Sequence, residues 1–190
     1  MTYDSPAAKP RLQRVIWVLL VANVLIALGY GLVSPVLPVY ARHFGVSISA
    51  TTFLITAFAL TRLLFAPVSG LLVQRLGERW VYVAGLLIVS VSTTACAFVQ
   101  TYGQLLFFRA LGGIGSTMFF IAAVGLMIRI SPEDARGRVA GLFATAFLLG
   151  TVGGPILGSL TAGFGLSVPF LFYGSVLIVT ATGVFVSLRH

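Results

Sequence analysis

The sequence predicts an all-α integral membrane protein with six transmembrane helices, and three observations lead to that class. Of the 190 residues, 58% are hydrophobic and only 8% are charged, against roughly 25% charged residues in an ordinary soluble domain. The apolar residues fall into six long runs separated by short loops. The basic residues gather in alternate loops, which is the pattern that sets the orientation of membrane proteins.

Each apolar run is long enough to cross a bilayer, for which about 20 largely apolar residues are needed. The first run exceeds the roughly 7 to 15 apolar residues of a secretory signal, so we expect it to be retained as a helix. Residues 1–14 are expected to form a cytoplasmic tail and residues 15–190 a six-helix bundle. The six runs cover about residues 12–39, 49–73, 80–100, 104–130, 139–161 and 168–188.

The distribution of Lys and Arg predicts that both termini lie in the cytoplasm. The loops after the first, third and fifth runs carry one basic residue, Arg42, and two further arginines lie inside runs. Because cytoplasmic segments collect Lys and Arg, the other side is expected to face the cytoplasm beneath the plasma (inner) membrane. That side carries nine of the twelve basic residues: Lys9, Arg11, Arg14, Arg75, Arg79, Arg129, Arg136, Arg138 and Arg189.

The same composition argues against several other classes. The basic residues lack the interleaved aromatic residues of a nucleic-acid-binding surface, and the sequence has no phosphate-binding loop for ATP. The four acidic residues, Asp4, Glu78, Glu133 and Asp134, all lie outside the apolar runs. We therefore expect no enzyme, no metal site and no cofactor. The single cysteine, Cys96, is interpreted as a packing residue.

The junction between the second and third runs carries the motif "GLLVQRLGERW". Gly70 is expected to let the second helix approach a neighbour closely, and Gly77 to allow a tight turn. Arg75 and Arg79 lie at headgroup level, where they can cap helix C-termini or bind carboxylates. The spacing of these four residues resembles the G-x-x-x-D-R-x-G-R-[RK] signature of the major facilitator superfamily.

This motif departs from the family signature at two positions. Gln74 stands where the family has Asp, and Glu78 stands where it has a basic residue. In the family, that Asp belongs to a cytoplasmic charge network that helps to hold an outward-open state. If such a network exists here, Glu78 is the residue expected to supply its negative charge.

Arg109 lies inside the fourth run, where a charged side chain is costly and is expected to face the interior of a helix bundle. Together with Gly113 and Gly115 it resembles the fourth-span pattern of the superfamily, in which the arginine is linked to proton coupling or substrate binding. Alternatively, its long side chain snorkels to the nearby outer interface.

Arg62 lies near the middle of the second run, about 20 Å from its outer end and too deep for easy snorkelling. Three kinds of partner remain open for it. These are a backbone carbonyl or polar side chain, a carboxylate from another half or subunit, and an anionic substrate.

The first run ends in "GYGLVSPVLPVYA", which resembles the superfamily's first-span pattern of small residues followed by P-x-x-P. Asn23 and Tyr30 are seven residues apart, so they share one face of a helix and can reach a central cavity. For Asn23, a hydrogen bond to a neighbouring helix is an equal alternative.

The fifth run contains "LLGTVGGPILGS", in which Gly150, Gly154 and Gly158 recur every four residues. Such glycines form a flat face that lets a neighbouring helix pack backbone to backbone. Pro155 removes one helical hydrogen bond and is expected to bend the helix. The stretch resembles the superfamily's G-x-x-x-G-P-x-x-G-G pattern, which is associated with antiporters. A general packing motif is the alternative.

The resemblance covers residues 14–189 and implies one half of a twelve-helix fold, built from two inverted three-helix repeats. The face of the first, second, fourth and fifth helices would then be open to lipid. A C-terminal half, a second copy of the chain or a different subunit is expected to cover it. Such a cover would complete the fold.

The implied function is a secondary active transporter that exports drug-like or amphipathic metabolites in exchange for protons by alternating access. Its partners would be the bilayer, the covering half, a small-molecule substrate and protons, but no nucleic acid. The proton carrier has to lie elsewhere, because arginine does not deprotonate in proteins. The alternative is a membrane subunit of another protein complex with no transport of its own.

Overall fold

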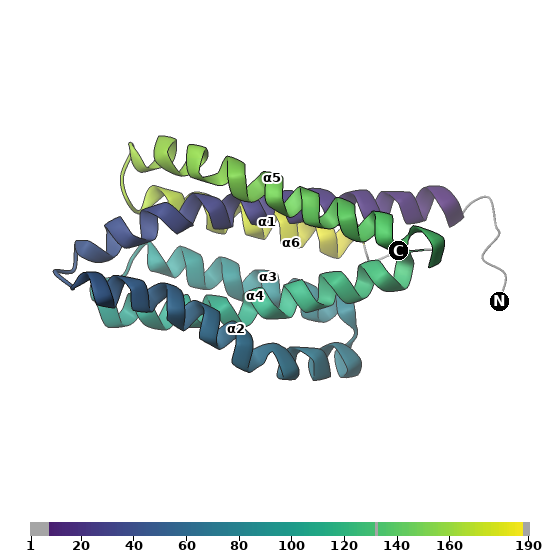
Figure 1. Ribbon diagram of the computed structural model, residues 1–190, viewed down its shortest axis with the longest axis horizontal. Helices are drawn as coiled ribbons and strands as arrows, with labels where there is room; N and C mark the ends of the chain where they lie inside the picture. Colours follow the sequence, from purple (N-terminus) through teal and green to yellow (C-terminus); the bar gives the residue numbers. More distant parts are fainter. Residues whose placement is uncertain (1–7, 132, 188–190) are drawn as a thin grey trace.

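The computed structural model describes residues 8–131 and 133–187, and six long helices make up most of them (Figure 1). Each helix is long and apolar enough to cross a membrane. The predicted all-α bundle of six spanning helices is therefore confirmed. The helices are α1 (Ala8–Arg42), α2 (Ile48–Leu76), α3 (Glu78–Cys96), α4 (Tyr102–Ile130), α5 (Arg136–Ala162) and α6 (Val168–Ser187), with a short 3-10 helix, η1 (Glu133–Ala135), before α5.

The helix boundaries lie within a few residues of the expected ones, except at the start of α1. Helix α1 begins at Ala8, inside the segment expected to be a tail, whereas its apolar part starts at Ile16. Gly77 alone joins α2 to α3 with φ at +83°, a backbone conformation that favours glycine. The expected tight turn at Gly77 is confirmed.

The six helices follow one another in space in the order α5, α1, α6, α3, α4, α2, because these neighbours share the most extensive contacts. Figure 1 shows α1, α5 and α6 as one group and α2, α3 and α4 as the other. The first three helices and the last three occupy equivalent places in this order. If α1 is exchanged with α4, α2 with α5 and α3 with α6, the same order is obtained, read from its other end. Since successive helices alternate in direction, the packing has the symmetry of two inverted three-helix repeats.

The two helices at the ends of this order, α2 and α5, are the least covered. Only 17% of the apolar window of α2 and 22% of that of α5 is buried, against 56% for α1, α3 and α4. Large apolar side chains point outward from both helices, among them Leu63 on α2 and Val152 on α5. Lipid or a further protein, rather than water, is the environment that such faces need.

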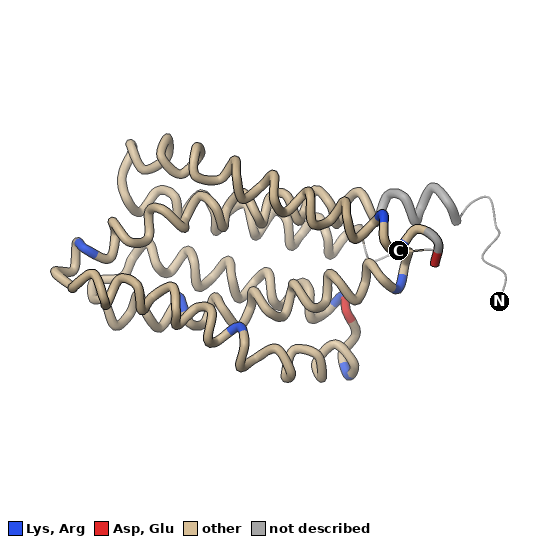
Figure 2. The backbone as a smooth tube through the Cα atoms, viewed as in Figure 1, with Lys and Arg blue, Asp and Glu red and all other residues tan. Residues whose placement is uncertain are grey.

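Charged residues gather mainly at the end of the bundle where α2 meets α3 and α4 leads to α5 (Figure 2). This is the end that the sequence assigns to the cytoplasm, whereas Arg42 ends α1 on the opposite side. Four of the charged residues used in the sequence argument have side chains outside the described part: Lys9, Arg11, Arg14 and Asp134. Asp4 and Arg189 lie wholly outside the described residues.

Candidate functional site

Two adjoining spaces lie inside the bundle where its helices diverge. A small inner cavity of about 30 Å³ is lined by residues from all six helices. A wider groove of about 490 Å³ is lined by α1, α2 and α4. Five residues line both spaces: Tyr30, Phe58, Arg62, Arg109 and Phe120.

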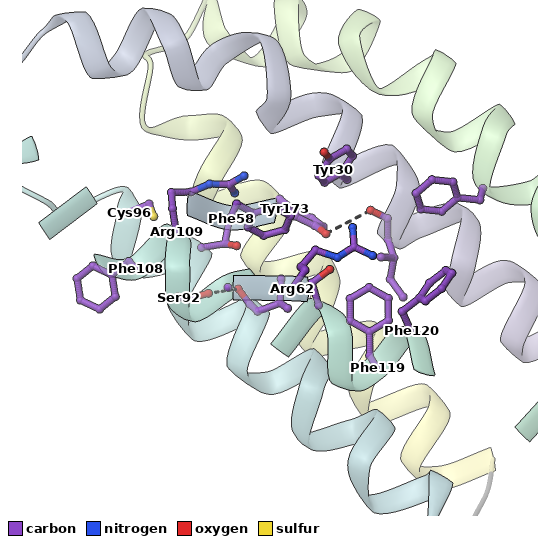
Figure 3. A pocket seen from close by; sticks show the side chains of 16 residues that line it. Tyr30, Phe58, Arg62, Ser92, Cys96, Phe108, Arg109, Phe119, Phe120 and Tyr173 are labelled. Atoms are coloured by element: carbon purple, nitrogen blue, oxygen red, sulfur yellow. Dashed lines mark hydrogen bonds between the residues drawn. The ribbon is translucent and has the colours of Figure 1, made fainter. Parts of the chain in front are cut away.

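The ring of Phe58 stands at the centre of this group (Figure 3). The guanidinium carbon of Arg109 lies 4.5 Å from the ring centroid, and that of Arg62 lies 6.0 Å from it. Arg62 is also 5.8 Å from the ring centroid of Phe120. Both arginines therefore lie within the range of cation–π attraction to Phe58.

Arg109 extends from α4 and lines the inner cavity beside Phe58 (Figure 3). Its Nε atom is buried and has no hydrogen-bond partner among the described residues. An unpaired buried donor is unfavourable, and more so when it belongs to a charged group. The side chain therefore retains capacity to bind an acceptor that enters the cavity.

The two arginines lack a carboxylate partner within the described part of the chain. The ion pairs found there join Glu78 to Arg129 and Glu133 to Arg136, both near the helix ends. Among the same residues, no group of three His, Cys, Asp or Glu side chains could hold a metal ion. The charge of the cavity is thus set by Arg62 and Arg109.

The two candidate residues of α1 have different environments. Tyr30 lines both spaces, and its ring centroid lies 6.1 Å from that of Phe58. Asn23 lines neither space. It is buried, and its Nδ2 donates a hydrogen bond of 2.7 Å to the backbone oxygen of Phe143 on α5. This geometry matches the helix-to-helix bond rather than the cavity role considered for Asn23.

The glycine face of α5, formed by Gly150, Gly154 and Gly158, packs against α1 of the same chain. A Cβ atom built on Gly154 would lie 2.5 Å from the Cα atom of Gly31 and from the backbone oxygen of Leu28. Cβ atoms on the other two glycines would lie 2.7 Å from the oxygen of Val24 and 2.5 Å from that of Leu32. Pro155 lies within the same continuous helix.

These contacts have a regular register. The three facing carbonyl groups on α1 belong to residues 24, 28 and 32, so both helices advance by four residues at each contact. No Cβ atom fits between the two backbones at these points. Backbone-to-backbone packing of this kind is the usual role of glycines spaced by four in membrane helices.

The two glycines that follow Arg109 serve different interfaces. Gly113 faces α2, where an added Cβ would collide with Thr61 Oγ1 and lie 2.8 Å from the backbone oxygen of Phe58. Gly115 faces α3, where an added Cβ would lie 2.7 Å from the backbone oxygen of Gly85. The two glycines therefore bring α4 close to both of its main neighbours.

The family assignment follows from direct comparison. Residues 19–190 match the family model described as Major Facilitator Superfamily. The chain belongs to the major facilitator superfamily.

Relatives and solved structures agree with this membership. Multidrug resistance protein 2 of Bacillus subtilis is 31% identical over 92% of this chain and 44% of its own length. Quinolone resistance protein NorA of Staphylococcus aureus is 33% identical over 86% of this chain and 42% of its own length. The chain therefore spans less than half the length of these relatives.

Two solved structures share the fold at lower sequence identity. A bacterial homologue of the human lysosomal transporter Spinster, in an inward-facing and unoccupied conformation, gives a TM-score of 0.83 at 20% identity. It covers 95% of this chain and 44% of its own. The human organic anion transporter MFSD10 gives 0.80 at 22% identity, over 94% of this chain and 48% of its own.

The superfamily signature between α2 and α3 forms only some of the expected contacts. Glu78 forms an ion pair of 3.1 Å with Arg129 in the last turn of α4, so it does provide a negative charge at this end. Arg79 donates a 3.2 Å hydrogen bond to the backbone oxygen of Phe185 near the end of α6. Arg79 thus caps a helix C-terminus, as its position predicts.

The other signature residues lie on uncovered surface. Gln74 and Arg75 are exposed at the end of α2. A Cβ atom on Gly70 would meet no atom within 4 Å among the described residues, so the close helix approach expected there is not made within this chain. The reason is that none of the other five helices covers this face of α2.

Sequence reasoning did not identify Phe58 and Tyr173 as cavity residues. Phe58 lies four residues before Arg62, so the two share a helix face, and that spacing was the available signal. Tyr173 lines the inner cavity, while its hydroxyl donates a 3.2 Å hydrogen bond to the backbone oxygen of Ile26. No local pattern distinguishes Tyr173 from the many other aromatic residues of the superfamily fold.

Proposed function

We propose that this chain is a six-helix half of a secondary active transporter that exports drug-like or amphipathic small molecules in exchange for protons. The observation that carries the proposal is the cavity in which Arg62 and Arg109 meet aromatic rings at the centre of a major facilitator bundle. The adjoining groove, of about 490 Å³, is lined by the same two arginines and has mainly apolar walls with few polar groups, as small-molecule sites do. Two relatives named for multidrug and quinolone resistance support the same cargo class.

Alternating access requires a second unit that covers the groove. The groove opens between α1, α2 and α4, and the apolar faces of α2 and α5 are exposed beside it. In the proposed transporter, a second six-helix unit packs on this side, as a C-terminal half, a second copy or another subunit. Substrate then lies between the two units and is released as they rock about it.

Proton exchange near neutral pH calls for a carboxylate or a histidine, and neither kind of residue is among the described residues that line the two spaces. Arginine stays protonated, and His43 lies in the loop between α1 and α2. We assign proton binding to the covering unit, and to Arg109 the role of sensing or binding the charged groups that approach it. A carboxylate close to Arg109 would have its proton affinity lowered by the positive charge.

The test is transport by the complete protein that contains this chain, reconstituted in proteoliposomes. Norfloxacin is expected to accumulate when a proton gradient is imposed, and its accumulation is expected to stop when nigericin dissipates the gradient. Arg109→Ala is expected to abolish the gradient-dependent component, whereas Arg138→Gln, a loss of charge on an exposed residue of α5, leaves it intact. Export by Arg109→Ala at the wild-type rate would contradict its role, and absence of gradient-driven transport would contradict the function.

Orientation has its own test, because Cys96 is the single cysteine and is buried. A cysteine introduced at Gly103, an exposed residue in the first turn of α4, is expected to react with a membrane-impermeant thiol reagent from outside the cell. A cysteine introduced at Gly137, at the start of α5, is expected to react only after the membrane is opened. The reverse labelling pattern would invert the topology.

A further inference from the structure

We propose that Arg62 and Arg109 form a receptor for an aromatic carboxylate, in which the guanidinium groups bind the anion and the surrounding aromatic rings hold the apolar body. This inference rests on the proposed transport function and specifies the class of molecule that is selected in the groove lined by both arginines. It predicts a preference by charge: anionic over neutral, and neutral over cationic.

The first step of the argument is the charge of the site. Arg62 and Arg109 come from different helices and lie within 6.0 Å of one ring centroid. Within the described residues, every ion-paired carboxylate belongs to a pair elsewhere, with Arg129 or Arg136. Two cations in a low-dielectric interior repel one another and are poorly solvated. An anion in the groove that both side chains line would lower both penalties.

The second step is the hydrogen-bonding capacity that remains. The Nε atom of Arg109 is buried without an acceptor. No hydrogen bond or ion pair is found for the guanidinium of Arg62 within the described part of the chain; its neighbours are the rings of Phe58 and Phe120. A guanidinium that stacks on a ring through its face keeps its N–H edge available. That edge matches the two oxygens of a carboxylate.

The third step is the apolar part of the ligand. The walls beside the two arginines are mainly apolar, and three aromatic residues, Tyr30, Phe58 and Phe120, line both spaces. Tyr30 and Phe58 lie with ring centroids 6.1 Å apart, a separation suited to aromatic contact. A flat ring system attached to a carboxylate therefore fits the walls and the charges together.

The test compares three probes that share one ring system and differ in charge: 1-naphthoate, 1-naphthalenemethanol and 1-naphthylmethylammonium. Binding to the complete protein in nanodiscs of neutral lipid is measured by titration calorimetry. We expect naphthoate to bind at least about tenfold more tightly than the ammonium probe, as one charge-assisted interaction allows. Equal or tighter binding of the ammonium probe would overturn the proposal. It would indicate that a carboxylate of the covering unit forms ion pairs with the two arginines and neutralises them.

Variants assign the preference to the two side chains. Arg62→Gln and Arg109→Gln are each expected to weaken naphthoate binding by about tenfold, while the alcohol changes by less than about twofold. Arg62→Lys keeps the charge but loses the planar fork, so an intermediate loss is expected. Arg138→Gln serves as the matched control. Unchanged naphthoate binding in both Gln variants would contradict the proposal.

The outcomes separate this inference from the proposed function. Norfloxacin export without naphthoate preference would refute the carboxylate receptor and leave the transporter assignment standing. Naphthoate preference without any gradient-driven export would refute the transporter and leave the receptor. The ranking of the three probes on the unmodified protein needs no variant, so a variant that fails to fold does not prevent a decision.

Discussion

The interface between α1 and α5 and the interface between α2 and α4 occupy equivalent places in the two inverted repeats, yet they are built differently. Between α1 and α5, glycines lie directly on backbone carbonyl groups. Between α2 and α4, Gly113 meets a threonine side chain as well as backbone, and Thr117 donates a 3.2 Å hydrogen bond to the backbone oxygen of Arg62. The α1–α5 interface is thus formed mainly by backbone atoms, whereas the α2–α4 interface also includes polar side chains.

This difference shows how one topology divides two tasks. Helices α2 and α4 carry Arg62 and Arg109, and the Thr117 bond fixes the backbone at Arg62 against α4. Helices α1 and α5 are joined by a uniform backbone contact whose described hydrogen bond is that of Asn23. The α2–α4 interface, which holds the charged residues, is thus specified by side chains. The α1–α5 interface is specified by glycines, which have no side chain.

The largest effect is expected from Gly154→Ala in the α1–α5 interface. The added Cβ would lie 2.5 Å from backbone atoms of Gly31 and Leu28, which cannot move away as a side chain can. Overpacking of this kind costs about 1–3 kcal/mol, with more for Gly154→Val. The apparent melting temperature of the purified protein measures the loss. Gly141→Ala on the same helix is the control, since its Cβ would meet nothing within 4 Å.

The second effect tests whether the α2–α4 interface is set by side chains. Gly113→Ala is also expected to cost about 1–3 kcal/mol, because the Cβ collides with Thr61. Thr61→Ala should recover part of that loss in the double variant, whereas Leu28→Ala should recover none of the loss caused by Gly154→Ala. Melting temperatures of both double-mutant cycles decide the comparison. Equal recovery in the two interfaces would show that they do not differ.

A smaller effect is expected when one hydrogen bond is removed from each interface. Asn23→Leu removes the bond to Phe143, and Thr117→Val removes the bond to Arg62. Each loss is expected to be about 0.6 kcal/mol, the average for hydrogen bonds between membrane helices. The two variants are expected to differ in ligand binding, since Thr117→Val should also change the affinity for naphthoate while Asn23→Leu should not. Both readouts use the assays described above.

The smallest effect concerns the charged end of the bundle. Glu78→Gln breaks the ion pair with Arg129, whose side chain is 73% exposed. Exposed pairs contribute about 0.2–1 kcal/mol, and salt screens them. The melting temperature should therefore fall slightly at low salt and match that of the wild type at high salt. Glu133→Gln, which breaks an exposed pair, should have no measurable effect; a larger loss there would reverse this ranking.

The fold was predictable because hydropathy and the spacing of loops determine how many helices cross a membrane. The inward position of Arg62 was also predictable, since its depth excludes easy escape to an interface. The helix that packs on the α5 glycines was not predictable, because a glycine face indicates close packing but does not identify the partner. Gly70 shows the converse case, in which a small residue faces no neighbour within the described part of the chain.

The cavity was less predictable than the helices. Its aromatic walls come from helices far apart in sequence, and one Phe among 15 carries no local mark of its neighbours. Asn23 had two equal interpretations, and only the position of α5 distinguishes them. Which side chains meet across helices depends on how each helix is rotated about its own axis. That rotation cannot be predicted from an apolar run that carries polar residues on several faces.

The register of α5 on α1 has a consequence for sequence variation. Carbonyl oxygens are common to all residues, so the contacts made by Val24, Leu28 and Leu32 do not depend on their side-chain identities. Helix α1 contributes two small residues to this contact, because Cβ atoms on Gly150 and Gly154 would lie 2.5 Å from the Cβ of Ala27 and from the Cα of Gly31. Substitutions should therefore spread unevenly across the interface: a change of side chain at 24, 28 or 32 keeps the carbonyl contact itself, whereas α5 has to remain glycine at 150, 154 and 158.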